Sequence, residues 1–132
     1  MKKVLFVCVE NSCRSQMAKG FFNYLSMDNR ADSAGTQPVG TVNPTSIQVM
    51  KEVDVNISEE RPKLITPQMK KEFDYIVTMG CINGCPLTPK HKTIEWNIAD
   101  PHGKPIDFFR KTRDNIRKHI EDLIEEIDKN EN

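Results

Sequence analysis

The chain has 132 residues, of which 37% are hydrophobic and 29% are charged, and its 19 basic residues balance its 19 acidic ones. This composition indicates one globular domain over residues 1–132 and excludes a disordered or fibrous chain. The net charge of zero gives no reason to expect a nucleic-acid partner. No stretch is long enough to span a membrane, and residues 4–9 are too short an apolar run for a signal peptide, so we expect a cytoplasmic protein.

The first elements in chain order are a strand, a helix and a second strand. Residues 3–8 are mostly apolar, which indicates a strand buried on both faces of a sheet. Residues 14–25 carry apolar side chains at helical spacing. Residues 30–34 predict a second strand that ends at Gly35.

Two prolines mark helix starts in the middle of the chain. Asn43 precedes Pro44 and Thr66 precedes Pro67, and each pair combines a capping side chain with a proline at the first helical position. The first of these helices is expected to bury one apolar face. That face is predicted to consist of Ile47, Met50 and Val53.

The second half of the chain predicts two more strands and a long helix. Residues 73–79 indicate a third strand closed by Gly80, and residues 92–97 indicate a fourth. A long amphipathic helix is expected from Pro105 to the C-terminal region. Its apolar stripe, with charged residues between, is Phe109, Ile116, Ile120, Leu123 and Ile127.

This alternation predicts a single doubly wound α/β domain, with a four-stranded parallel sheet in the flavodoxin-like order 2-1-3-4 and helices on both faces. Such sheets bind ligands beyond the carboxyl ends of their strands. Cys8 ends the first strand, Cys81 follows the third and Asp100 follows the fourth. We therefore expect a functional site at this edge of the sheet.

The loop from Cys8 to Arg14 has the composition of an anion site. Backbone N–H groups of such a loop, next to a helix N-terminus, can surround a tetrahedral dianion, and the planar guanidinium of Arg14 can bind two of its oxygens. The same positive environment would make Cys8 a nucleophilic thiolate below its ordinary pKa of about 8.5. Ser15 could donate a hydrogen bond to that thiolate, and Asn11 could brace the loop. The alternative is a buried cysteine at a strand end with an exposed arginine nearby.

Residues 8–15, Cys-Val-Glu-Asn-Ser-Cys-Arg-Ser, resemble the anion loop of the low-molecular-weight protein tyrosine phosphatase superfamily, which includes the thioredoxin-coupled arsenate reductases. Residues 16–18, residues 33–36 and Asp100-Pro101 are similar to the same family, so the resemblance covers essentially the whole chain. It implies that the oxyanion-binding loop consists of Val9, Glu10, Asn11, Ser12, Cys13, Arg14 and Ser15. It also implies that Asp100 is a general acid, whereas on its own Asp100 could be a turn residue.

Glu10 departs from the family pattern, because many members have glycine at this position. A carboxylate beside a dianion is unfavourable unless it points outward, and a non-glycine residue there should avoid a positive φ. His102-Gly103 after Asp100-Pro101 is a second departure from the phosphatases, which usually have aromatic residues there.

The presence of Cys81 and Cys85 bears on the choice between two candidate activities, that of a phosphatase and that of a reductase. A phosphatase needs one nucleophilic cysteine and an acid, whereas a reductase can supply two electrons from further thiols. The first and third strands are neighbours in the expected order, so Cys8 and Cys81 should leave the same edge within disulfide reach. Asn83-Gly84 favours a turn that would allow Cys81 and Cys85 to pair.

The resemblance to arsenate reductases implies a relay of three cysteines. Cys8 attacks arsenate, Cys81 then forms a Cys8–Cys81 disulfide as arsenite leaves, and Cys85 forms the product disulfide Cys81–Cys85. Thioredoxin or a related dithiol would regenerate the enzyme, and phosphate or sulfate should mimic arsenate. The alternative function is hydrolysis of phosphomonoesters through a Cys8 phosphoenzyme.

Other interpretations concern the remaining groups. Cys13 is either a small buried packing residue or a backup partner that protects Cys8 from over-oxidation. Some members hold potassium near the loop; Asn11 and Ser33 match that site, but Lys19 stands where an acidic residue is usual.

A zinc site of four cysteines is disfavoured by the C-x4-C and C-x3-C spacings and by Arg14, so we expect no metal and no cofactor. A non-catalytic redox sensor would not need Asp100 or the complete anion loop.

Overall fold

The computed structural model describes residues 1–80 and 88–130. The strands are β1 (Lys3–Cys8), β2 (Arg30–Gly35), β3 (Tyr75–Met79) and β4 (Thr93–Trp96). The helices are α1 (Arg14–Leu25), α2 (Pro44–Lys51), α3 (Pro67–Glu72) and α4 (Ile106–Asn130), with a 3₁₀ turn η1 (Lys90–Lys92) before β4. None of the described helices has both the length and the apolarity that a bilayer crossing requires.

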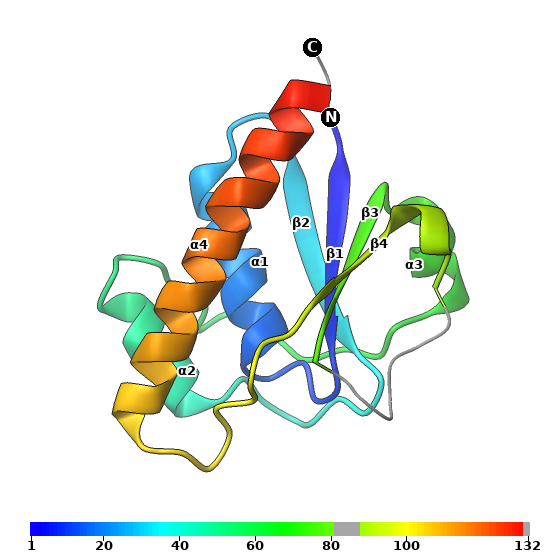
Figure 1. The fold of residues 1–132 in the computed structure, drawn as a ribbon. Coiled ribbons are helices and arrows are strands. Elements are labelled where there is room, and N and C mark those ends of the chain that lie inside the picture. The colour runs from blue at the N-terminus through cyan, green and yellow to red at the C-terminus, as the bar shows by residue number, and fades with distance from the viewer. Residues whose placement is uncertain (81–87, 131–132) are drawn as a thin grey trace.

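The sheet confirms the predicted topology. Its four strands lie in the order β2-β1-β3-β4, and all three pairings are parallel. The N-terminus and the last turns of α4 lie at one end of the molecule, and the carboxyl ends of β1, β3 and β4 lie at the other end (Figure 1). The carboxyl ends of the strands thus meet at one edge, where a doubly wound fold binds its ligand.

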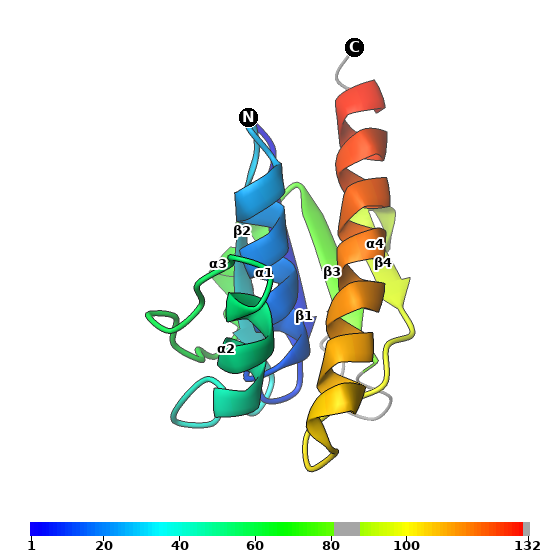
Figure 2. The ribbon, with the colours of Figure 1, turned by 90° about the vertical axis from the view of Figure 1, so that its left-hand side faces the viewer.

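Alternate residues of β1 enter two separate apolar layers. Val4, Phe6 and Cys8 belong to the main core beneath α1 and α4, whereas Leu5 and Val7 face a smaller cluster on the side of α3. Figure 2 shows α1 and α4 side by side over one face of the sheet, with α3 behind it. Because side chains alternate along a strand, the apolar residues that follow Lys3 in β1 are buried on both faces.

The predicted helix starts and the apolar stripe of α4 are confirmed. The Asn43 side chain accepts hydrogen bonds from two backbone N–H groups of the first turn of α2, and Thr66 caps α3 in the same way. All five residues of the α4 stripe are buried. The predicted buried face of α2 was partly wrong, because Val49 is buried together with Met50, whereas Ile47 and Val53 are only partly buried.

Two strand boundaries also differ from the prediction. β3 begins at Tyr75, because the N–H of Phe73 still bonds to the carbonyl of Met69 at the end of α3. β4 covers only Thr93–Trp96, because η1 occupies the residues before it. Both differences are of two residues or fewer and leave the carboxyl ends of the strands, where the site lies, close to their predicted places.

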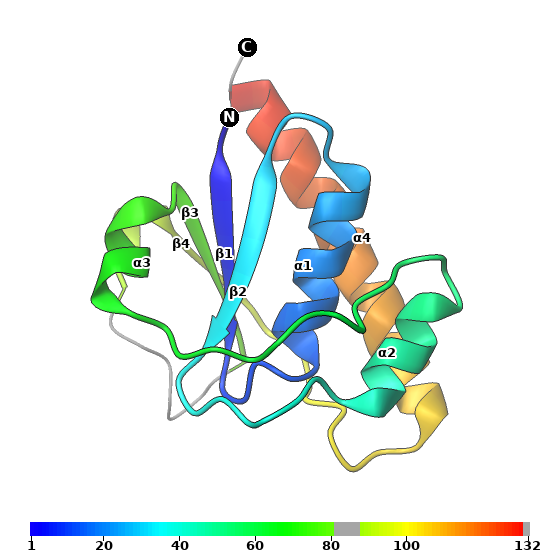
Figure 3. The same cartoon turned by 180° about the vertical axis from the view of Figure 1, so that it is seen from behind.

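The outer edge of β2 is covered at both ends. The side-chain amide of Asn23 on α1 forms two hydrogen bonds with the backbone of Ala31, as a neighbouring strand would. Its Oδ1 accepts from the Ala31 N–H at 2.8 Å, and its Nδ2 donates to the Ala31 carbonyl at 3.1 Å. Gly35 forms a parallel bridge with Leu64 at the other end. Figure 3 shows this segment before α3 running past the end of β2. Covering an edge in this way protects it from pairing with other chains.

Candidate active site

The loop between β1 and α1 lies at the carboxyl edge of the sheet. Cys8 is the last residue of β1 and Arg14 is the first residue of α1. Both side chains are buried, with exposed fractions of 2% for Cys8 and 5% for Arg14. Both residues of the C-x5-R pattern are therefore buried at this edge of the sheet, which contradicts the alternative in which the arginine is exposed.

The carbonyl oxygens of the loop all point to partners outside it. Hydrogen bonds reach them from the backbone of residues 36–43, from the Gln16 side chain and from the Met17 N–H. The accepting carbonyls are those of Cys8, Val9, Glu10, Asn11, Ser12 and Cys13. None of the N–H groups of residues 9–13 donates to a carbonyl of the described chain. A loop with its carbonyls turned outward leaves its N–H groups to bind an anion.

A chain of hydrogen bonds leads from the backbone of Lys63 to the Cys8 thiol. The Lys63 N–H donates to Asn11 Oδ1 at 2.9 Å, so the amide nitrogen of Asn11 faces Ser15 and donates to its Oγ at 2.7 Å. The Ser15 hydroxyl then has its proton available for Cys8 Sγ, 2.9 Å away. Hydrogen bonds to the charged form stabilise a thiolate, so this arrangement favours a nucleophilic Cys8.

The positive backbone angle of the loop occurs at Asn11 and not at Glu10. Asn11 has φ 53°, and asparagine tolerates the left-handed region better than most residues. Glu10 is half-buried and keeps an ordinary φ, as expected for a residue with a side chain. The sequence pattern suggested a bracing role for Asn11 but contained no signal for its backbone conformation.

Arg14 is anchored by one nitrogen of its guanidinium group, and the other two do not take part in this anchor. Its Nη1 donates to the carbonyls of Met79 at 2.5 Å and Ile98 at 3.0 Å, across the ends of β3 and β4. Its Nε is buried with no partner among the described residues. The Nε and Nη2 edge of a guanidinium carries two parallel N–H donors, which suit two oxygens of one tetrahedral anion.

Asp100 stands at the open side of the loop. Its Oδ2 lies 3.7 Å from Nη2 of Arg14, and its Oδ1 accepts from the His102 N–H at 3.1 Å. The side chain is 46% exposed, so it borders the solvent and the site at once. The structure thus brings Asp100 to the arginine, at a position from which a carboxyl group can reach an oxygen of a bound anion.

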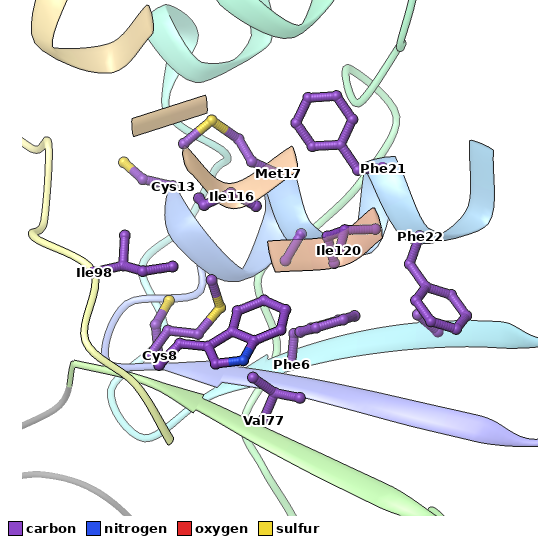
Figure 4. Close-up of a cluster of buried hydrophobic side chains, with 14 of the residues drawn as sticks. Phe6, Cys8, Cys13, Met17, Phe21, Phe22, Val77, Ile98, Ile116 and Ile120 are labelled. Carbon is purple, nitrogen blue, oxygen red and sulfur yellow. The ribbon is translucent and has the colours of Figure 1, made fainter. Parts of the chain in front are cut away.

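Cys13 is a buried thiol in a setting unlike that of Cys8. Burial raises the pKa of the Cys13 thiol from an ordinary 9.0 to about 11, although the nearby Ser46 hydroxyl opposes the shift. Figure 4 shows Cys13 beside Met17, whereas Cys8 lies nearer Phe6 and Ile98. A thiol that stays protonated over the physiological range is a poor nucleophile, which favours the packing role for Cys13.

We expect the raised pKa of Cys13 to lower stability in alkali. The folded thiol keeps its proton up to about pH 11, whereas in the unfolded chain it ionises above pH 9, so the unfolded state is favoured between these values. The free energy of unfolding should fall by about 2–3 kcal/mol across this window. Denaturant titrations at pH 8 and pH 11 measure it. The fall should be smaller by this amount in Cys13→Ala, and an equal fall would contradict the assignment.

Lys19 lies close to Asp32, the residue before Ser33, and Ser33 is one of the two residues that match the potassium site of some family members. Its ammonium group pairs with Glu60 and lies 3.5 Å from Oδ1 of Asp32, which also binds the ammonium group of Lys63. Burial works against ionisation of Asp32, but these cations hold its pKa below the usual range. Cations of the chain itself thus neutralise the carboxylates, so the residues do not fit a potassium ion. Within residues 1–80 and 88–130, no group of three His, Cys, Asp or Glu side chains could hold a metal.

Cys81 and Cys85 lie outside the described residues. The last described residue before them is Gly80, which follows β3, and β3 pairs directly with β1. Sequence reasoning proposed Cys8, Arg14, Ser15, Asn11 and Asp100 as site residues. The structure joins Cys8, Ser15 and Asn11 by hydrogen bonds and places Asp100 beside Arg14. Sequence reasoning missed the Lys63 backbone and the Met79 and Ile98 carbonyls, because main-chain groups carry no signal in a sequence.

The fold and the site define a class of small α/β proteins that present a cysteine and an arginine to a tetrahedral oxyanion after the first strand. The chain belongs to the low molecular weight phosphotyrosine protein phosphatase family, whose model matches residues 3–132. This finding confirms the superfamily that the loop sequence resembled.

The chain is also similar to individual proteins within this family. An arsenate reductase of Staphylococcus xylosus is 40% identical over 126 residues, which cover 92% of this chain and 95% of the relative. A glutaredoxin arsenate reductase of Synechocystis sp. is 36% identical over 132 residues, covering 96% of this chain and 99% of the relative. A solved arsenate reductase in the phosphate binding state has a TM-score of 0.87 at 35% identity, covering 96% of this chain and 99% of that one.

Proposed function

We propose that the protein is an arsenate reductase that passes electrons through Cys8, Cys81 and Cys85. The observation that carries this proposal is the loop around Cys8, whose carbonyls all turn outward and whose Arg14 presents a buried, unpartnered Nε within the described structure. Such a cup fits a tetrahedral oxyanion, with arsenate as substrate and phosphate or sulfate as mimics. The arsenate reductases among the relatives support the choice of arsenate.

The first step forms a bond between sulfur and arsenic. The Cys8 thiolate, stabilised by Ser15, attacks the arsenic atom of bound arsenate, and Arg14 holds two of its oxygens. Asp100 gives a proton to the departing oxygen, which leaves as water. The product is a covalent adduct of Cys8 with arsenic still in its oxidised state.

The second and third steps transfer two electrons and release the product. The Cys81 thiolate attacks Cys8 Sγ, a Cys8–Cys81 disulfide forms, and the electron pair of the sulfur–arsenic bond leaves with arsenite. Cys85 then attacks Cys81, which frees Cys8 as a thiolate and leaves a Cys81–Cys85 disulfide. Thioredoxin or a related dithiol reduces that disulfide, and the glutaredoxin named for the Synechocystis relative is a second candidate. A cytoplasmic location would provide such reductants.

Hydrolysis of phosphomonoesters is the second candidate function. Cys8, Arg14 and Asp100 would supply the nucleophile, the arginine and the acid that such a reaction needs, and the family model is that of a phosphatase. His102-Gly103 next to Asp100-Pro101 provides no aromatic side chain for a phosphotyrosine ring. We therefore expect any phosphatase activity to be weak and to act on small esters.

A single turnover with arsenate and without reductant tests the relay. Wild-type protein should accumulate the Cys81–Cys85 disulfide, and Cys85→Ser should trap Cys8–Cys81, as read by peptide mapping under non-reducing conditions. If arsenate leaves all thiols reduced while an aryl phosphate is hydrolysed rapidly, the phosphatase function is correct instead. Thioredoxin and glutaredoxin are then compared as reductants of the oxidised protein, which decides between the two partners.

A further inference from the structure

Gly80 stands where three parts of the site meet. It follows β3 with a φ of +74°, and the Arg14 guanidinium lies directly against it. A Cβ atom at this position would lie 2.7 Å from Arg14 Nη1 and 2.8 Å from the Ile98 carbonyl oxygen. Both distances are shorter than side-chain carbons adopt in proteins, so a side chain at residue 80 displaces one of these groups.

We propose that Gly80 is a positioning residue for oxyanion binding, because its missing side chain leaves the space in which Arg14 is anchored. Arg14 Nη1 donates to the carbonyl of Met79, just before Gly80, and to that of Ile98 on the other side. Gly80 thus lies directly against the Arg14 nitrogen that these two carbonyls hold. This role rests on the proposed oxyanion chemistry of the loop. It extends the proposed site by a residue that would act through the placement of Arg14 and not by contact with the anion or the nucleophile.

The anchor determines which edge of the guanidinium faces the loop. With Nη1 held by two carbonyls, Nη2 lies beside Asp100 and Nε is buried with no partner among the described residues, which leaves both free to bind an anion in the loop. The guanidinium is a rigid plane, so movement of Nη1 by the radius of a methyl group turns the other two nitrogens as well. The side chain is buried, so no solvent is available to replace the two hydrogen bonds that such a movement breaks.

The alternative response to a side chain is movement of the Ile98 backbone. Ile98 is itself buried in the main core and lies two residues before Asp100. A shift of this segment costs packing and carries the carboxyl group of Asp100 with it. Either response disturbs Arg14 or Asp100, the pair of groups proposed to face the anion, whereas the hydrogen bonds of the Cys8–Ser15–Asn11 chain involve neither Arg14 nor Ile98.

Other glycines of the chain provide the comparison that isolates this effect. Gly103 has nearly the same backbone angle, φ +78°, but no atom lies within 4 Å of the Cβ that would be added there. Gly103→Ala therefore introduces the same left-handed strain without a steric contact. Gly80→Asn does the reverse, because asparagine tolerates a positive φ but still carries a Cβ atom.

The test measures how strongly inorganic phosphate protects Cys8 from alkylation by iodoacetamide. Gly80→Ala and Gly80→Asn should each need about 10- to 100-fold more phosphate for half protection, the loss expected for misplaced hydrogen bonds to a charged group. Gly103→Ala should match wild type. The alkylation rate of Cys8 without phosphate should change far less than phosphate protection in both Gly80 variants, because the hydrogen bond between Ser15 and Cys8 is not part of the Arg14 anchor. For arsenate turnover, we expect KM to rise more than kcat falls in both Gly80 variants.

The outcomes separate this inference from the proposed function. Unchanged phosphate protection in Gly80→Asn, with loss only in Gly80→Ala, would show that backbone strain alone matters and would overturn the positioning role. Loss of cooperative thermal unfolding in both Gly80 variants would make Gly80 a folding residue and would overturn it too. If wild-type protein binds phosphate but never reduces arsenate, the proposed reductase fails while the effect of Gly80 on phosphate protection still stands.

Discussion

We expect Cys8→Ser to lower both arsenate reduction and aryl phosphate hydrolysis by about 10⁴- to 10⁶-fold, because both reactions begin with attack by this one sulfur atom. The serine hydroxyl is not ionised near neutral pH, so the hydrogen bond from Ser15 no longer stabilises a charged nucleophile. Initial rates with arsenate plus thioredoxin, and with an aryl phosphate, measure the two activities side by side.

Cys81→Ser is the matched variant for this experiment. It should remove arsenate turnover, because no second thiol attacks the Cys8 adduct, and it should leave any weak phosphatase activity as in wild type. Equal loss of both activities in Cys81→Ser would contradict the relay. Substantial phosphatase activity in Cys8→Ser would contradict the assignment of the nucleophile, whatever happens with arsenate.

The second large effect is expected for Arg14→Lys, which keeps the positive charge and removes the planar guanidinium. Lysine cannot donate to the Met79 and Ile98 carbonyls and also present two parallel N–H groups to an anion. Affinity for phosphate should fall by about 10²-fold or more, since two charge-assisted hydrogen bonds are lost. Protection of Cys8 from alkylation measures this affinity, and thermal unfolding measures the cost of losing the two carbonyl contacts.

Arg110→Lys is the control for Arg14→Lys. Arg110 lies on α4, where its guanidinium binds the Glu52 carboxylate in a bidentate manner at the protein surface, with Nε donating to Oε1 and Nη2 to Oε2. The same chemical change there should leave phosphate affinity unchanged and alter stability by less than about 1 kcal/mol, as is usual for exposed ion pairs. If both substitutions weaken phosphate binding equally, the effect is one of overall charge and Arg14 has no special place in the site.

The fold was predictable because its signals are local and repeated. The uninterrupted apolar residues of β1 indicated a strand buried on both faces, and the structure shows its alternate residues in two apolar layers. The proline-marked starts of α2 and α3 and the apolar stripe of α4 reflect hydrogen bonding and helical periodicity within each segment. The buried face of α2 was less accurate, because it depends on how that helix packs against α4 and α1.

The candidate site was predictable to the extent that its residues are close in sequence. The spacing of Cys8 and Arg14, with Ser15 beside them, lies in one loop between a strand and a helix, where geometry leaves little choice. Asp100 was placed correctly because parallel strands end at one edge of the sheet. The left-handed conformation fell on Asn11, one residue after Glu10, because steric strain depends on the whole path of the loop.

By itself, then, the sequence predicts the fold, the nucleophile, the arginine and the edge at which they meet, since these follow from local patterns and from the rules of parallel sheets. Only the tertiary structure decided which nitrogen of Arg14 is bonded to carbonyls, which way the Asn11 amide points and that burial raises the pKa of the Cys13 thiol. Each of these depends on main-chain groups or neighbours that lie far away in sequence, such as the Ile98 carbonyl and the Lys63 N–H. Packing brings such groups together, and residue types alone do not reveal them.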